Sequence, residues 1–237
     1  EFEPREERRE KDYAEMLERA LADADAKTRI VRDTTHMIAR RGGPTNIVVF
    51  DHPATEWIGK SLADLALARE ITPVDMAFPL QFTGYPERLG GARLRGFSMS
   101  EQDIEAFAAQ SWCLTVSDAC IGLPDYPPVH ARYYGTFPRK IHHYAMTRGV
   151  LSVEAAVRSM TTLPAEVLGL RNRGKLAEGY VADIAVIDLN RIRDRADFFQ
   201  PHQYPDGVEY VLVNGTFVVE GGRLTYAAPG QVLTIED

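Results

Sequence analysis

The stretch that decides the fold is CLTVSDACIGLPDYPPVHARYYGTFPR, residues 113–139. It opens with an apolar run, CLTV, of the kind that forms a buried β-strand, and that strand is followed at once by Asp118. The loop beyond it is rich in proline and contains His130 and Arg132. Because prolines restrict the backbone, such a loop loses less conformational entropy when it closes on a ligand. The stretch therefore predicts a stiff binding loop beside a carboxylate.

Two interpretations of Asp118 follow from its position alone. If CLTV is a strand of a (β/α)8 barrel, Asp118 lies at the C-terminal end of that strand, where barrel active sites are built. A carboxylate there can bind a divalent metal, accept a proton from water, or do both. Asp is also a common turn-capping residue, so a purely structural role stays open.

Strand and helix patterns alternate on both sides of this stretch, up to about residue 170. Apolar runs at residues 46–51, 92–97 and 113–116 predict strands. Helical patterns cover residues 61–70, 72–82, 100–109, 137–149 and 152–170, with Thr72 and Ser152 as N-caps. The alternation predicts an α/β fold with parallel strands.

The two ends of the chain show different residue patterns from this central part. The first forty residues have helical periodicity, whereas the residues after 170 are rich in β-forming side chains. Asn214 and Gly215 separate two apolar runs there, which predicts a hairpin. We therefore divide the chain into a helical segment (1–44), a set of strand–helix units (45–170) and a small β domain (171–237).

Composition excludes several classes of partner. The 237 residues carry a net charge of −7 and no basic stripe, which argues against nucleic-acid binding. The apolar runs are too short to cross a membrane, and no secretory pattern precedes them. Cys113 and Cys120 fit no metal or redox spacing, and Cys120 is expected to be a small buried thiol rather than a nucleophile. A cytoplasmic protein is expected.

Several motifs resemble those of a known superfamily. LPAEVLGL, RGKLAEGYVADIAVID and VEYVLVNGTFVV are similar to segments of many amidohydrolases. FSMSEQD, HARYYGTFPR and HQYPDGVEYVLVNG resemble more narrowly the N-acyl-D-amino-acid deacylases (D-aminoacylases). The resemblance covers about residues 45–235. It implies the C-terminal portion of a metal-dependent (β/α)8 barrel, at residues 45–170, and the C-terminal half of a small β-sandwich domain, at residues 171–237.

The resemblance also implies a site and a reaction. Asp118 matches the carboxylate that binds the metal, expected to be zinc, and that transfers the catalytic proton in hydrolysis of N-acyl-D-amino acids. Arg132 would bind the substrate carboxylate, because a guanidinium pairs with it bidentately. His130 would contact the substrate and Met99 would shape the acyl pocket, although a structural role is open for each of these three residues. Ala119 departs from the glycine usual in the family, which affects substrate preference more than chemistry.

The expected metal ligands are incomplete. The sequence contains no His-x-His pair, and a whole barrel of about 250 residues does not fit before the β domain. The resemblance therefore implies a partner, the N-terminal half of the same enzyme. His36 and His52 are expected to be structural or surface residues, because a metal site needs several converging ligands.

Two alternatives remain open. One is a cyclic amide hydrolase of the hydantoinase or dihydroorotase type, which shares the generic motifs. The other is a non-catalytic partner chain or a fragment that is inactive without the N-terminal half. An Asp118 carboxylate that faced bulk solvent, far from any cavity, would overturn the hydrolase interpretation.

Overall fold

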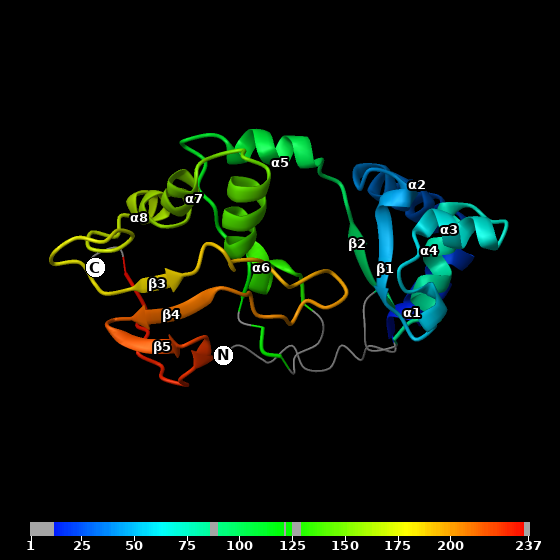
Figure 1. The fold of residues 1–237 in the computed structure, drawn as a ribbon. Helices are drawn as coiled ribbons and strands as arrows, with labels where there is room; N and C mark the ends of the chain where they lie inside the picture. The colour runs from blue at the N-terminus through cyan, green and yellow to red at the C-terminus, as the bar shows by residue number, and fades with distance from the viewer. Residues whose placement is uncertain (1–11, 86–89, 121, 125–128, 235–237) are drawn as a thin grey trace. The chain divides into compact units, whose positions relative to one another are not determined.

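The computed structural model describes residues 12–85, 90–120, 122–124 and 129–234. The chain divides into two compact units, Glu1–Ser100 and Glu101–Asp237 (Figure 1). Each unit combines helices with its own antiparallel sheet. The three-part division expected from the sequence, with boundaries after residues 44 and 170, stays a prediction.

The first unit contains four α-helices in its described part: α1 (Asp12–Ala22), α2 (Ala24–Arg40), α3 (Leu62–Ala68) and α4 (Pro73–Phe82). Short 3-10 turns occur at Pro44–Asn46 and Thr55–Trp57. The helical pattern predicted for the N-terminal segment is confirmed over residues 12–40, and its part before Asp12 lies outside the described residues. The helix breaks at Asp23, whose carboxylate caps α2 by accepting the N–H of Ala26 at 2.7 Å. The predicted cap of α4 is also confirmed, since the Thr72 hydroxyl accepts the N–H of Asp75.

The two strands of this unit pair antiparallel, which corrects the predicted parallel layout. β1 (Ile47–Asp51) and β2 (Arg93–Gly96) lie side by side, with Ile47 opposite Gly96 and Asp51 opposite Arg93 (Figure 1). An apolar run predicts that a strand exists but not which way its neighbour runs. Here the two strands are each other's ladder partners in the described part of the chain, and their directions are opposed.

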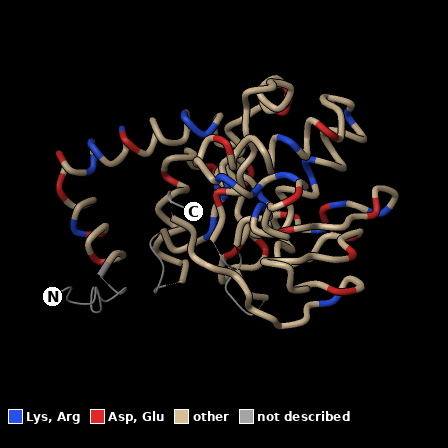
Figure 2. Tube along the Cα trace, turned by 90° about the vertical axis from the view of Figure 1, so that its left-hand side faces the viewer, with Lys and Arg blue, Asp and Glu red and all other residues tan. Residues whose placement is uncertain are grey.

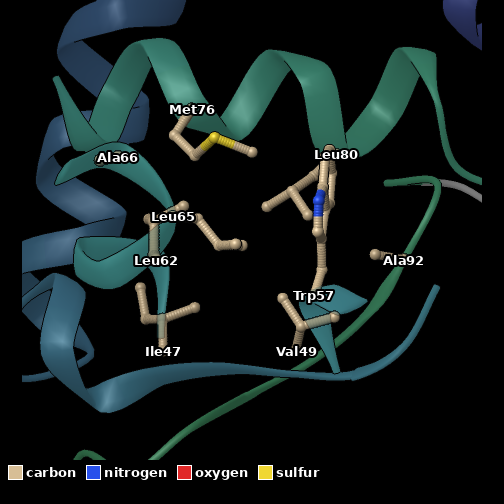
Figure 3. Close-up of a cluster of buried hydrophobic side chains, with 9 residues drawn as sticks. All are labelled: Ile47, Val49, Trp57, Leu62, Leu65, Ala66, Met76, Leu80 and Ala92. Carbon is tan, nitrogen blue, oxygen red and sulfur yellow. The ribbon is translucent and has the colours of Figure 1, made fainter. Parts of the chain in front are cut away.

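The core of the first unit lies between β1 and the helices α3 and α4 (Figure 3). Alternation along β1 buries Ile47 and Val49 on one face. The other buried members are Trp57, Leu62, Leu65, Ala66, Met76, Leu80 and Ala92. The three layers therefore share one continuous apolar cluster.

The second unit begins with helices: α5 (Glu101–Ala108), α6 (Arg132–Arg139), a π-helix η3 (Lys140–Thr147), α7 (Val153–Met160) and α8 (Thr162–Leu168). The helix predicted over residues 137–149 is confirmed, with its second part wound as a π-helix. The helix predicted over residues 152–170 is broken at Thr161. Because Pro164 lacks an N–H, it is accommodated in the first turn of a new helix, where that donor is not needed.

The remaining strands form one four-stranded antiparallel sheet with the order β3-β4-β5-β6. They are β3 (Ile184–Ile187), β4 (Val208–Val213), β5 (Thr216–Glu220) and β6 (Arg223–Leu224). Asn214 and Gly215 join β4 to β5 with φ values of 47° and 75°, as a type I′ turn requires. The predicted hairpin is confirmed.

The strand predicted at residues 113–116 is not formed, which is the main error of the sequence analysis. The backbone N–H of Thr115 donates to the carbonyl of Ser159 on α7 at 2.8 Å instead of to a strand. Val116 in this run is 61% exposed, and Trp112 just before it is 66% exposed. A strand requires a neighbouring strand to complete its ladder, and no described segment supplies one here.

The distribution of charged and apolar residues in the structure agrees with the expectations from composition. Acidic and basic positions are interspersed along the helices that follow the N-terminus (Figure 2). None of the helices among the described residues is long and apolar enough to cross a membrane.

The packing of α3 makes a testable prediction about stability. Leu65 is 2% exposed in the core, whereas Leu67 on the same helix is 80% exposed. We expect Leu65→Ala to lower the free energy of unfolding of the first unit by about 2–5 kcal/mol, because it leaves a cavity. Leu67→Ala is the matched control and should change it by less than about 0.5 kcal/mol. Chemical denaturation of both variants checks this, and equal losses would contradict the assigned core.

Candidate functional site

Asp118 lies on the surface of the second unit. Its side chain is 83% exposed, and its backbone adopts a left-handed conformation with φ of 48°. Non-glycine residues rarely adopt this conformation, although Asp does so more often than most. Among the described residues the carboxylate therefore faces solvent, which is the placement stated above to overturn the hydrolase interpretation.

The structure brings two of the predicted site residues together. Arg132, the first residue of α6, places its guanidinium Nη2 2.9 Å from Oδ2 of Asp118. Both side chains are accessible to solvent, and exposed ion pairs of this kind contribute only about 0–1 kcal/mol. The pair therefore orders the two groups but can open at little cost.

His130 supports the start of α6. Its Nδ1 accepts the backbone N–H of Arg132 at 3.1 Å, which leaves Nε2 to carry the proton of the neutral ring. Its ring meets Phe198 edge-on, with centroids 5.0 Å apart. The predicted contact residue thus lies next to Arg132 and also has the packing role that the sequence left open.

Tyr134 also belongs to the site, although no sequence motif pointed to its role. Its hydroxyl donates to the backbone carbonyl of Gly122, four residues after Asp118. Burial, with a smaller contribution from Tyr204, raises the pKa of the Tyr134 hydroxyl above its ordinary value. The neighbouring Tyr133 also packs on this glycine, since a Cβ at Gly122 would lie 2.8 Å from its ring.

Met99 belongs to the first unit, whereas Asp118, His130 and Arg132 belong to the second. Its side chain is 68% exposed, so it does not fill a core. Its role in an acyl pocket stays a prediction.

One expectation about a side chain is wrong. Cys120 is exposed instead of buried, because it follows Asp118 in a surface loop beyond the apolar run. Lys140 on η3 is buried, and its Nζ donates to the carbonyl of Ala108 at 3.4 Å. Burial lowers the pKa of this lysine, with a smaller opposing effect from Cys113.

Two other basic residues near Lys140 contact acidic side chains. Arg139 lies 3.3 Å from Asp194, and Nε2 of His143 lies 3.2 Å from Glu101. These contacts connect α6 and η3 to neighbouring segments.

The outlying histidines have the structural and surface positions expected of them. His36 is exposed on α2. His52 is 1% exposed, stacks on Trp57 with ring centroids 4.5 Å apart, and accepts the N–H of Ala54 at 2.9 Å through Nδ1. Burial lowers the pKa of His52, against an opposing effect of Glu56.

The described residues do not make a metal site by themselves. No group of three or more His, Cys, Asp or Glu side chains converges within the described ranges. Zinc is usually held by three or four protein ligands, and Asp118 is the single candidate that the sequence motif identifies. A complete site requires ligands from elsewhere.

Comparison with known proteins identifies the chain. Residues 22–219 match the model of the amidohydrolase family. The chain belongs to this family. It is 34% identical to the N-acyl-D-glutamate deacylase of Alcaligenes xylosoxydans xylosoxydans over 186 residues, which are 78% of this chain and 36% of that protein. The D-aminoacylase of the same organism is also 34% identical, over 79% of this chain and 36% of its own length.

Solved structures agree. A D-aminoacylase crystal structure matches with a TM-score of 0.62 and 32% identity, covering 76% of this chain and 36% of that one. The N-acyl-D-glutamate deacylase of Bordetella bronchiseptica, complexed with zinc and a phosphonate mimic of the tetrahedral intermediate, matches with a TM-score of 0.59 and 29% identity, over 80% and 39% of the two chains. The fold is thus of the amidohydrolase superfamily, and the chain spans about a third of the length of the curated relatives it matches.

The environment of His52 makes a testable prediction about pH. Because folding lowers its pKa below the ordinary 6.5, the unfolded chain takes up the proton more readily than the folded chain. Stability is therefore complete above about pH 6.5 and falls as the pH decreases towards the folded-state pKa. Thermal unfolding between pH 8 and pH 5 should show this loss. His52→Asn keeps an acceptor for Ala54 but cannot titrate, and a slope equal to that of the parent chain would contradict the assignment.

Proposed function

We propose that the complete enzyme, of which this chain supplies the C-terminal portion, hydrolyses the amide bond of N-acyl-D-amino acids. The observation that carries the proposal is the 34% identity to two deacylases over most of the chain. The family match at residues 22–219 includes both Asp118 and Arg132. The adjacency of these two side chains, 2.9 Å apart, supports a shared site.

We further propose that residues 113–116 become a barrel strand when the N-terminal half of the enzyme is present. Their backbone has no strand partner in the described structure, and the exposed side chains of Val116 and of the preceding Trp112 would then be covered. The antiparallel sheet of β3 to β6 would be the C-terminal half of a β-sandwich domain. The boundaries predicted after residues 44 and 170 belong to this proposal.

A divalent metal, with zinc as the first candidate, is part of the proposal. The zinc in the Bordetella bronchiseptica deacylase supports it. Asp118 would supply one carboxylate ligand. The described residues offer no complete ligand set, so the others would come from the N-terminal half.

Asp118 and Arg132 would act after their ion pair opens. Asp118 accepts the proton of the attacking water and returns it to the leaving amine, as a general base and then a general acid. Arg132, released from Asp118, binds the carboxylate of the substrate through two parallel hydrogen bonds. His130 keeps the first turn of α6 in place through its contact with the N–H of Arg132, and Met99 would line the acyl pocket.

The proposal predicts a separation of activity from stability. Asp118→Asn in the complete enzyme should lower kcat by about 10²–10⁴-fold, because the proton acceptor is lost. The melting curve should change little, since an exposed pair contributes only about 0–1 kcal/mol. Asp33→Asn is the matched control, because Asp33 forms an exposed pair of the same kind with Arg32 at 2.9 Å. Full activity of Asp118→Asn would refute the proposed role.

Substrate assays test the reaction itself. The chain joined to its N-terminal half should hydrolyse N-acetyl-D-amino acids faster than their L-enantiomers, whereas this chain alone should be inactive. Turnover of dihydroorotate or a hydantoin without turnover of the linear amides would favour the cyclic amide hydrolases. Inactivity on every substrate would favour a non-catalytic partner chain.

A further inference from the structure

The segment between β3 and β4 lies along α6, on which the candidate site is built. Near the end of the helix, Arg139 pairs with Asp194 at 3.3 Å. In the middle, a Cβ on Gly135 would lie 3.4 Å from the Cβ of Asp194, so the backbone of α6 approaches this segment closely. Before its first turn, the ring of His130 meets Phe198. The motif HQYPDG, at residues 202–207, follows directly and has no role in the function proposed above.

Two rings of that motif enclose Tyr134. The ring of His202 meets it at a centroid distance of 5.8 Å and an angle of 86°, and the ring of Tyr204 at 5.3 Å and 74°. Both are edge-to-face arrangements, which favour one ring orientation over others. Because the Tyr134 ring is fixed, its hydroxyl is directed at the carbonyl of Gly122.

Two side chains of α6 therefore contact the loop that contains Asp118 and Gly122, which we call the Asp118 loop. Arg132 contacts the carboxylate of Asp118, and Tyr134 contacts the backbone of Gly122. The proposed reaction breaks the first contact, because Asp118 and Arg132 turn to other partners. The second contact involves neither catalytic group and can persist throughout.

We propose that His202 and Tyr204 are positioning residues for this site. They hold Tyr134 so that its bond to Gly122 keeps the Asp118 loop in place once Arg132 is released to the substrate. The inference rests on the proposed function for its catalytic consequence, but the contact it describes exists in this chain alone. A packing role alone accounts poorly for Tyr204, which is 54% exposed.

The first experiment measures the loop without any catalysis. Cys120 is exposed and lies between Asp118 and Gly122, so a nitroxide label on it, in a Cys113→Ala background, reports loop motion. We expect Tyr204→Ala, His202→Ala and Tyr134→Phe each to shift the spin-label spectrum towards the mobile component. Tyr204→Phe and His202→Phe keep the edge-on ring and should leave the spectrum unchanged.

The matched control is Tyr210→Ala. Tyr210 forms an aromatic pair with Phe217 in the sheet, at 5.9 Å, and is 39% exposed. A mobility shift in Tyr204→Ala but not in Tyr210→Ala supports the inference. Equal spectra for Tyr204→Ala and the parent chain, or equal shifts in both alanine variants, would overturn it.

The second experiment uses the complete enzyme. Loss of loop placement in Tyr204→Ala should lower kcat by about tenfold, and Tyr204→Phe should restore it. Because both residues act through one contact, the double variant Tyr134→Phe/Tyr204→Ala should be no slower than the slower single variant. Fully additive losses would overturn the inference. If the enzyme hydrolyses none of the substrates, the proposed function fails while the spin-label result still decides the positioning role.

Discussion

Two contacts from α6, Arg132 to the carboxylate of Asp118 and Tyr134 to the backbone of Gly122, together set the arrangement of the candidate site. They join the first turn of α6 to a surface segment that pairs with no strand among the described residues. Residues two apart in a helix point in different directions, so Arg132 and Tyr134 reach that loop at separate points. Side chains of α6 thus fix the position of the loop. The segment that precedes β4 in turn packs against α6.

The ion pair forms without a strand at residues 113–116. The described part of the chain offers this run no neighbouring strand to pair with, and Asp118 beyond it faces solvent. The apolar run before Asp118 instead contacts α7, because the N–H of Thr115 donates to the carbonyl of Ser159. Arg132 then neutralises a charge that, in the proposed enzyme, would face other ligands.

The sequence predicted what is encoded locally. The cap at Thr72, the turn at Asn214 and Gly215, and the end of the helix before Gly149 each depend on a few adjacent residues, and all are present. The pairing directions of β1 and β2 and the absent strand at residues 113–116 depend on which segments meet in space, which periodicity does not encode.

The site shows the same division. Motif resemblance located Asp118 and Arg132, and the structure places them in contact. It did not reveal the role of Tyr134, because that role depends on Gly122, His202 and Tyr204, which are brought together by folding. The burial of Lys140 was missed for a related reason, since the π-helical winding of η3 and the proximity of Ala108 are tertiary features.

The antiparallel ladder of β1 and β2 also has a topological consequence. Asp51 at the end of one strand is opposite Arg93 at the start of the other, so the chain leaves and re-enters this ladder at neighbouring points. The helices α3 and α4 lie between these points in the sequence, and Leu65 and Met76 on them are buried in one cluster with Val49 of β1. The ladder closes the ends of the very segment that covers it, so the strands and the two helices form one cooperative folding unit.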